Sequence, residues 1–359
     1  MKKLILLICL AAAVLTILSP AHAENDGDCI YSLLDERGNR LTRRAGRIYE
    51  GDEYISSDNL LYRVISVDDA ACTATAELRG SAVIDTAAWN AFLAASAEDA
   101  KDAKDDDQKL ICMYSTHSDE SYVPSDGASS LWNNAGIYDV GDALKENLEK
   151  KGITVEYSDE TFLPHDAGAY NRSRSTVEEY VKKLPDAIID IHRDGVDADE
   201  YETKVDGENT SMVRLFVGRS NQNAAENKAF AQQLKAAADK AYPGLIKDIF
   251  IGKGNYNQEL YPQAILLEFG TYEIEKEKAI SATEYMADVI DDVLFGESAK
   301  AETGKKNGSA AVGIAWAVGI VIIGAIIYAL AATGRLQPMW SKLKKGASEL
   351  TLGMFSKRK

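Results

Sequence analysis

Short apolar runs alternate with segments of helical periodicity over residues 109–297. The runs have the length and the β-branched content of buried strands, which are predicted at 110–116, 153–157, 187–192, 212–218, 249–252 and 264–269. The periodic segments predict helices at 133–151, 173–184, 222–241 and 275–294. Strands that alternate with helices predict an α/β domain whose sheet is mostly parallel and covered by helices on both faces.

Residues 24–88 have a different pattern of apolar and polar positions, without helical periodicity. Alternating or β-branched stretches at 47–55, 61–67 and 72–78 are separated by Gly and Asp, which is typical of strands and hairpins. We therefore expect a small β module here. Residues 89–108 are rich in Ala and Asp and predict an acidic, solvated linker.

Two apolar segments lie near the ends of the chain. The first follows two lysines and ends in an A-x-A pattern at Ala23, which predicts a signal peptide over 1–23. The second is uncharged and predicts a transmembrane helix over 310–333, after a polar juxtamembrane linker at 298–309. The tail at 334–359 is basic and is therefore expected in the cytoplasm. We expect a single-pass protein of the cell membrane with residues 24–309 on the outer side.

The net charge of −16 conceals an asymmetry between the parts of the chain. The predicted signal peptide holds two lysines and the tail a net six positive charges, so residues 24–309 carry −24. An acidic region of this size argues against nucleic acid as a partner, because phosphates bind to Lys and Arg.

Three cysteines follow the predicted signal peptide. Cys29 and Cys72 both fall in the β module, and export permits a disulfide between them, although two separate thiols are equally compatible with the sequence. Cys112 lies within a predicted strand and is interpreted as a small buried hydrophobe.

Three polar residues stand at the ends of three predicted strands, namely His117, His192 and Glu268. In an open α/β sheet the carboxyl ends of the strands face the ligand crevice, so these residues are expected to meet although they are far apart in sequence. Glu120 lies three residues after His117. Two imidazoles, one carboxylate ligand and a second carboxylate as base form the composition of a catalytic zinc site. His117, Glu120 and His192 are thus predicted metal ligands, and Glu268 is the predicted catalytic base.

Other polar residues are weaker candidates. Arg193 and Arg174 are candidate binding groups for a substrate anion, and Asp194 is a candidate for orienting an imidazole or contacting substrate. A surface ion pair is the alternative interpretation for Arg193 and Asp194, and Arg174 is the weaker of the two arginine candidates. His165, on a predicted loop, is an alternative third ligand or a substrate contact.

Four ordered segments resemble a known family. They read Tyr114-Ser-Thr-His-Ser-Asp-Glu-Ser-Tyr, Ile188-Ile-Asp-Ile-His-Arg-Asp, Tyr256-Asn-Gln-Glu-Leu and Leu266-Leu-Glu-Phe-Gly. Over residues 109–295 the chain is similar to the stage II sporulation protein P family, peptidoglycan hydrolases of the zinc N-acetylmuramoyl-L-alanine amidase fold. The resemblance implies His117 and His192 as ligands, Glu120 as the match to the family's H-x-x-E motif, and Glu268 as catalytic acid. In the wider amidase fold the third ligand can begin the next helix, where Asp142 is the nearest acid.

The expected function is cleavage of the bond between N-acetylmuramic acid and L-alanine in peptidoglycan by a membrane-tethered zinc amidase. The resemblance further implies endopeptidase activity and a partner like stage II sporulation protein D during engulfment. Two departures from the family pattern, Ser115 in place of a second histidine and the N-terminal module, leave alternatives open. These are a wall-binding or scaffold protein without turnover, and a zinc peptidase that acts on stem peptides.

Overall fold

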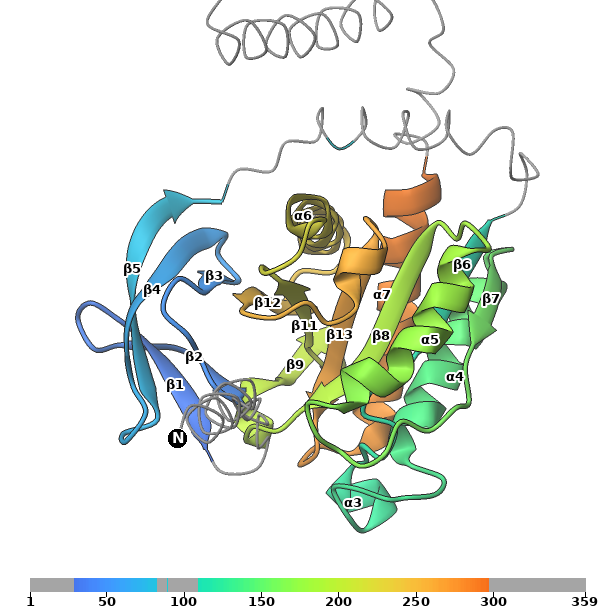
Figure 1. Ribbon diagram of the computed structural model, residues 1–359, viewed down its shortest axis with the longest axis horizontal. Helices are drawn as coiled ribbons and strands as arrows, with labels where there is room; N and C mark the ends of the chain where they lie inside the picture. Colours follow the sequence, from blue (N-terminus) through green and yellow to red (C-terminus); the bar gives the residue numbers. More distant parts are fainter. Residues whose placement is uncertain (1–28, 83–88, 90–108, 297–359) are drawn as a thin grey trace, which may run out of the picture. The chain divides into compact units, whose positions relative to one another are not determined.

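The computed structural model describes residues 29–82, 89 and 109–296 (Figure 1). The predicted signal peptide, the linker after Trp89, the predicted transmembrane segment at 310–333 and the basic tail lie outside the described residues. Within the described ranges, no helix is both long enough and apolar enough to cross a membrane.

The elements of the predicted α/β domain form close to their expected positions. Its main strands are β6 (Leu110–Tyr114), β7 (Thr154–Tyr157), β8 (Ala187–Asp194), β11 (Val213–Gly218), β12 (Ile246–Gly252) and β13 (Ala264–Thr271). Its helices are α3 (Val123–Asp126), α4 (Gly136–Glu149), α5 (Ala169–Val181), α6 (Ala224–Ala241) and α7 (Lys276–Phe295). The sequence did not predict the short helix α3, two 3-10 helices, or one hairpin. The 3-10 helices are η1 (Ala198–Glu200) and η2 (Gln258–Leu260), and the hairpin consists of β9 (Glu202–Val205) and β10 (Glu208–Ser211).

The N-terminal part contains five strands, β1 (Ile30–Asp35), β2 (Arg40–Ala45), β3 (Glu53–Ile55), β4 (Leu60–Asp68) and β5 (Thr73–Ser81). Among the described residues, these strands and those of the α/β domain form one eleven-stranded sheet in the order β2-β1-β5-β4-β3-β12-β11-β13-β8-β6-β7 (Figure 1). Strand β3 joins the two parts, because it pairs antiparallel with β12.

The sheet is mixed, so the prediction of a mostly parallel sheet is wrong. Half of its neighbouring pairs are antiparallel, including β11 with β13 in the α/β part and β3 with β12 at the junction. The physical reason is that an apolar run encodes burial but not direction, so the sequence pattern could not orient these strands.

Alternation along the strands assigns each face of the sheet to a different layer. In β6, Ile111 and Met113 belong to the large core that contains the buried faces of α4, α6 and α7. Leu110 and Cys112 point the other way, into a core with α5. Near β11 and β12 that second face is covered instead by the N-terminal strands, which pack on Phe216 and Phe250. Helices therefore cover one face completely and share the other with β strands.

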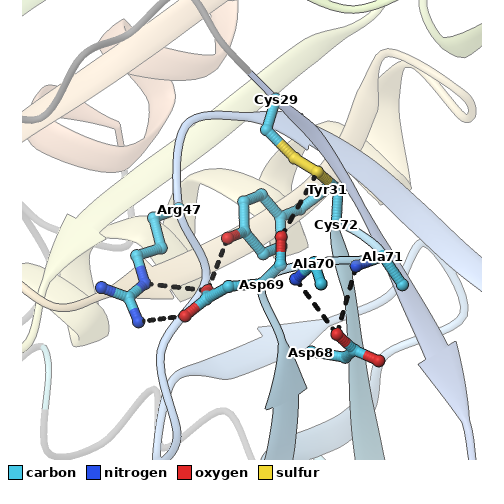
Figure 2. Close-up of a disulfide and its surroundings, with 8 residues drawn as sticks. All are labelled: Cys29, Tyr31, Arg47, Asp68, Asp69, Ala70, Ala71 and Cys72. Carbon is cyan, nitrogen blue, oxygen red and sulfur yellow. Dashed lines mark hydrogen bonds and ion pairs between the residues drawn. A yellow bond between two sulfur atoms is a disulfide. The ribbon is translucent and has the colours of Figure 1, made fainter.

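A disulfide joins Cys29, directly before β1, to Cys72, directly before β5 (Figure 2). Beside it the Tyr31 hydroxyl donates to Asp69 Oδ1 over 2.6 Å, and Arg47 also donates to this carboxylate. The disulfide ties the start of the first strand of the N-terminal part to the β4–β5 turn. It adds a covalent link to two strands that are already hydrogen-bonded neighbours, β1 and β5. Cys112 is buried in β6, as expected.

A fully buried arginine fastens the N-terminal strands to the α/β part. Arg214, on β11, donates to both carboxylate oxygens of Asp248 over 2.7 and 3.0 Å and to Asp194 Oδ2 over 2.7 Å. Its third nitrogen also donates to the Thr42 hydroxyl and to the Arg43 carbonyl, both on β2, over 2.7 and 2.9 Å. A buried guanidinium is tolerated because its donors and its charge are matched in this way.

Candidate active site

Three of the predicted site residues come from the carboxyl ends of neighbouring strands. His117 follows β6 by three residues, His192 lies on β8, and Glu268 lies on β13. The register places Glu268 directly opposite His192 on one side and opposite Arg214 on the other. Ala264, Leu266 and Glu268 share one face of β13, because alternate residues of a strand point to the same side. On this face Ala264 packs in the core with α5 and Leu266 packs in the core with the N-terminal strands. The Glu268 side chain therefore projects from the face that these two layers cover.

His117, Glu120 and His192 form a compact buried group whose possible ligand atoms all lie within 4.8 Å of one another. Glu120 Oε1 is 3.3 Å from Nδ1 of His117 and 3.4 Å from Nδ1 of His192. Two ligands bound to zinc at 2.1 Å in tetrahedral geometry are separated by about 3.4 Å. The nitrogen and oxygen donors and their spacing are therefore compatible with a metal site.

The electrostatic surroundings of the three side chains differ. Burial opposes a charge on His192, but Asp190 and Glu120 outweigh it and raise the pKa of His192 well above its ordinary value, so a metal bound there would have to displace a proton. Burial lowers the pKa of His117, so its ring stays neutral, which is the form that binds metals. Burial opposes the ionisation of Glu120, but His192 and Arg193 outweigh it and hold the pKa of Glu120 well below its ordinary range. The backbone N–H of Arg193 also donates to Glu120 Oε2 over 2.8 Å.

Asp190 forms a close ion pair with His192 that the sequence analysis missed, although the Nε2 atom of His192 has no hydrogen bond of good geometry to any described residue. Asp190 Oδ1 is 3.0 Å from His192 Nε2, while its two oxygens accept from the backbone N–H and the hydroxyl of Thr116 over 2.9 and 2.8 Å. This arrangement leaves Nδ1 of His192 facing Glu120. A carboxylate two residues before a histidine in a strand shares its face, and this spacing was the available signal.

Glu268 lines the same cavity as His117, Glu120 and His192. Burial raises the pKa of Glu268 to about 8, and the carboxylates of Asp194 and Glu120 act in the same direction. Among the described residues, no group donates a hydrogen bond to its buried Oε2. Such a carboxyl group can hold or release a proton near neutral pH, as general acid–base chemistry requires.

The two alternative third ligands do not belong to the compact group of possible metal ligands. His165 lines the cavity, but its Nδ1 lies 2.9 Å from Asp119 Oδ1 and its ring stacks on that of His117 at 4.0 Å between centroids. Asp142 is exposed on α4. Neither belongs to the compact group, so Glu120 is the third member.

The weaker candidates are engaged in other contacts. Arg193 lines the cavity, but its guanidinium donates to the carbonyls of Ser121 and Ser129 over 3.3 and 2.9 Å. Asp194 accepts from Arg214 and from the Tyr201 hydroxyl, so its oxygens serve that network rather than an imidazole. Arg174 pairs with Glu178 and Glu259 and does not line the cavity.

Comparisons with known proteins agree with these motifs. A family model described as Stage II sporulation protein P matches residues 69–291. Stage II sporulation protein P of Bacillus subtilis (strain 168) is 31% identical over 219 residues, which cover 55% of this chain and 55% of the relative. The chain thus spans about half the length of this curated relative.

Two solved structures are more distant. The amidase AmiC2 of Nostoc punctiforme is 14% identical with a TM-score of 0.34, over 53% of this chain and 96% of that one. The CwlD amidase from Clostridioides difficile, solved with the GerS lipoprotein, is 13% identical with a TM-score of 0.35, over 54% and 99%. TM-scores this low carry no argument about activity. The family model, which matches more than half of the chain, shows that the protein belongs to the stage II sporulation protein P family.

Proposed function

We propose that this protein is a zinc-dependent hydrolase that cleaves the N-acetylmuramoyl-L-alanine amide bond of peptidoglycan during sporulation. The observation that carries the proposal is the buried group of His117, Glu120 and His192, which shares one cavity with a protonatable Glu268. Membership of the stage II sporulation protein P family supports both the substrate class and the sporulation context.

In this proposal each residue has a distinct task. His117, Glu120 and His192 would hold the zinc ion, and Asp190 forms an ion pair with His192. A zinc ion held by these residues would supply Lewis acidity and would lower the pKa of water. Glu268 would accept a proton from the attacking water molecule and donate it to the leaving nitrogen.

The proposal also places the protein in the cell. The predicted signal peptide and transmembrane helix would tether it to the cell membrane with the active site toward the wall, confining hydrolysis to nearby peptidoglycan. A lytic enzyme like stage II sporulation protein D is the proposed partner. Protease treatment of intact cells tests this topology: digestion of the region around 24–309 from outside is expected, and complete protection would refute it.

Mass spectrometry of fragments released from purified peptidoglycan tests the reaction. Residues 24–305, loaded with zinc, should release stem peptides that begin with L-alanine, and a chelator should abolish this release. Glu268→Gln should reduce the rate by about 10²- to 10⁴-fold, the usual contribution of a general acid–base group. The matched control is Glu149→Gln, which alters an exposed glutamate at the end of α4 and should leave the rate unchanged.

The same spectra discriminate the alternatives. Cleavage inside the stem peptide would identify a peptidase, and binding without any fragment would identify a wall-binding protein. Ser115 had suggested the second alternative, but its side chain contacts the Tyr157 hydroxyl at 3.0 Å and does not line the cavity. Full activity of Glu268→Gln would refute the assigned roles.

A further inference from the structure

Two aromatic side chains form a corner of the candidate active-site cavity. Tyr170 is the second residue of α5, and Tyr256 lies in the loop between β12 and η2; both line the cavity and are partly exposed. Their rings meet at 83°, with centroids 5.1 Å apart. The buried ring of Phe216, on β11, contacts the Tyr256 ring at 4.9 Å between centroids. The cavity therefore has one aromatic wall.

The backbone that carries Tyr256 is strained. Tyr256 and Asn257 have positive φ angles of 54° and 55°. A bulky residue rarely adopts this conformation, and it persists only where the surrounding structure compensates for its cost. Such strain concentrates at functional sites, where it aims a side chain. Tyr256 is neither a candidate metal ligand nor the candidate base, so its conformation requires another explanation.

Neighbouring elements hold this strained loop in place. The side-chain amide of Asn257 donates to the Tyr170 carbonyl over 2.9 Å. The side-chain amide of Gln258 accepts from the Gly218 backbone N–H over 2.8 Å and donates to the Phe216 carbonyl over 3.0 Å. The loop is thus fixed to α5 and to β11, the two elements that carry the other rings of the aromatic wall.

Two glycines make room for the Tyr256 ring. A Cβ atom added to Gly218 would lie 2.9 Å from Cδ2 of Tyr256, and one added to Gly254 would lie 2.6 Å from its Cε2. Real Cβ atoms do not approach other atoms this closely, so a larger residue at either position would displace the ring. The Tyr256 hydroxyl also donates to the Lys253 carbonyl over 2.9 Å. The position of the ring in the cavity is therefore determined by its surroundings.

The aromatic corner lies beside the candidate metal ligands. Between ring centroids, Tyr170 is 5.6 Å from His117 and 6.4 Å from His192. In the proposed reaction a short lactyl ether joins the scissile amide to the pyranose ring of N-acetylmuramic acid. When the amide is bound at the metal group, this sugar ring must therefore lie close to it.

The chemistry of the aromatic wall favours the sugar over the peptide. The C–H groups of a pyranose ring form an apolar face that packs on an aromatic ring, whereas the methyl group of the first alanine covers little aromatic surface. Among the described residues that line the cavity, phenyl and phenol rings occur only in Tyr170, Phe216 and Tyr256. The aromatic wall is thus the part of the cavity suited to the glycan side of the scissile bond.

We infer that Tyr256 and Tyr170 bind the pyranose ring of the N-acetylmuramoyl group and so determine specificity for the glycan side of the substrate. The inference rests on the proposed function and deepens it, because it names the part of the cavity that recognises the sugar. It also gives the strained loop a task, namely to hold the Tyr256 ring where the sugar binds.

Calorimetry with two ligands that differ only in the sugar tests the inference. The protein is the zinc-loaded full chain with Glu268→Gln, in which cleavage should be slow. The ligands are N-acetylmuramoyl-L-alanyl-D-isoglutamine and D-lactoyl-L-alanyl-D-isoglutamine, which keeps the scissile amide but lacks the sugar. We expect the muramoyl ligand to bind more tightly. Tyr256→Ala should weaken its binding by about 10-fold, as expected for one lost aromatic contact, and should leave binding of the lactoyl ligand unchanged.

Three further variants sharpen the test. Tyr256→Phe keeps the ring and should retain the preference for the muramoyl ligand. Gly254→Ala should reduce this preference, because the added methyl group displaces the ring. The control Tyr285→Ala removes a partly exposed ring of α7 that packs on the core of the opposite sheet face, and it should bind both ligands like its parent. Binding of the lactoyl ligand, which every variant should retain, reports that the site is folded.

Four outcomes would overturn the inference. Two concern the parent protein, which would bind both ligands equally or bind neither. The other two concern Tyr256→Ala, which would keep the full preference for the muramoyl ligand or would weaken both ligands equally, as a purely structural role of the loop requires. Fragment release from peptidoglycan by the unmutated protein is measured separately, so the proposed function can stand if this inference fails.

Discussion

Replacing Arg214 with methionine should strongly destabilise the folded protein. Methionine fills a similar volume but cannot donate the five hydrogen bonds that reach Asp248, Asp194, Thr42 and the Arg43 carbonyl. Two buried carboxylates lose the guanidinium that neutralises them. Asp248 keeps Lys247 at 4.0 Å and the Thr42 hydroxyl at 3.2 Å, and Asp194 keeps the Tyr201 hydroxyl at 2.9 Å. Breaking one buried pair costs about 3–5 kcal/mol, and we expect a loss near the upper end of that range. This is a large share of a typical folding free energy.

The loss should depend on pH in a defined direction. Burial opposes ionisation of Asp248, but Arg214 and Lys247 hold the pKa of this carboxyl below its ordinary value in the folded protein. Its stabilising contribution is therefore present above about pH 4 and is lost as the pH falls through the folded pKa. In the variant, burial without Arg214 should raise that pKa, so the folded variant binds a proton more readily. The difference between the two proteins should shrink from pH 7 to pH 5.

Urea unfolding followed by circular dichroism measures both effects. The control is Arg79→Met, which disrupts an exposed ion pair with Glu77 and should cost at most about 1 kcal/mol. A loss for Arg214→Met no larger than that of the control would refute the structural role of this arginine. A difference that grows toward pH 5 would refute the electrostatic explanation.

Three further predictions concern the disulfide and the metal group. Replacing Cys29 and Cys72 with serine should lower the free energy of unfolding by up to about 4 kcal/mol, as expected for a separation of 43 residues; an unchanged urea midpoint would contradict this. Asp190→Asn should weaken zinc binding by about 10- to 100-fold in competition with a chromogenic chelator, because the His192 ring loses its charged partner. Glu120→Gln should weaken zinc binding further, since it removes the anionic ligand itself; metal content equal to that of the unmutated protein would exclude Glu120 as a ligand.

Local patterns in the sequence were sufficient to find the elements of the α/β part and to bring His117, His192 and Glu268 to one edge of the sheet. They were insufficient for strand direction, as the antiparallel pairing of β11 with β13 demonstrates. Strands β1 and β2 were missed because they lack a clear alternation, and the β9–β10 hairpin because it is polar.

The missed residues share a physical cause. In the sequence Arg214 is a single charged residue inside an apolar strand, with no nearby residue that indicates a partner. Its partners Asp248 and Thr42 are 34 and 172 residues away. Only the folded chain brings such groups together. Asp190 was closer to recognition, because it lies two residues from His192 on the same face.

The pairing of β3 with β12 has a consequence for any attempt to divide the protein. Without residues 29–82, β12 would become a sheet edge with unsatisfied backbone groups, and Phe216, Phe250 and Leu266 would form an uncovered apolar patch beside it. An exposed edge next to such a patch is a template for intermolecular β pairing. A fragment limited to residues 109–296 should therefore aggregate, and the N-terminal strands act as the built-in protection of the sheet against self-association.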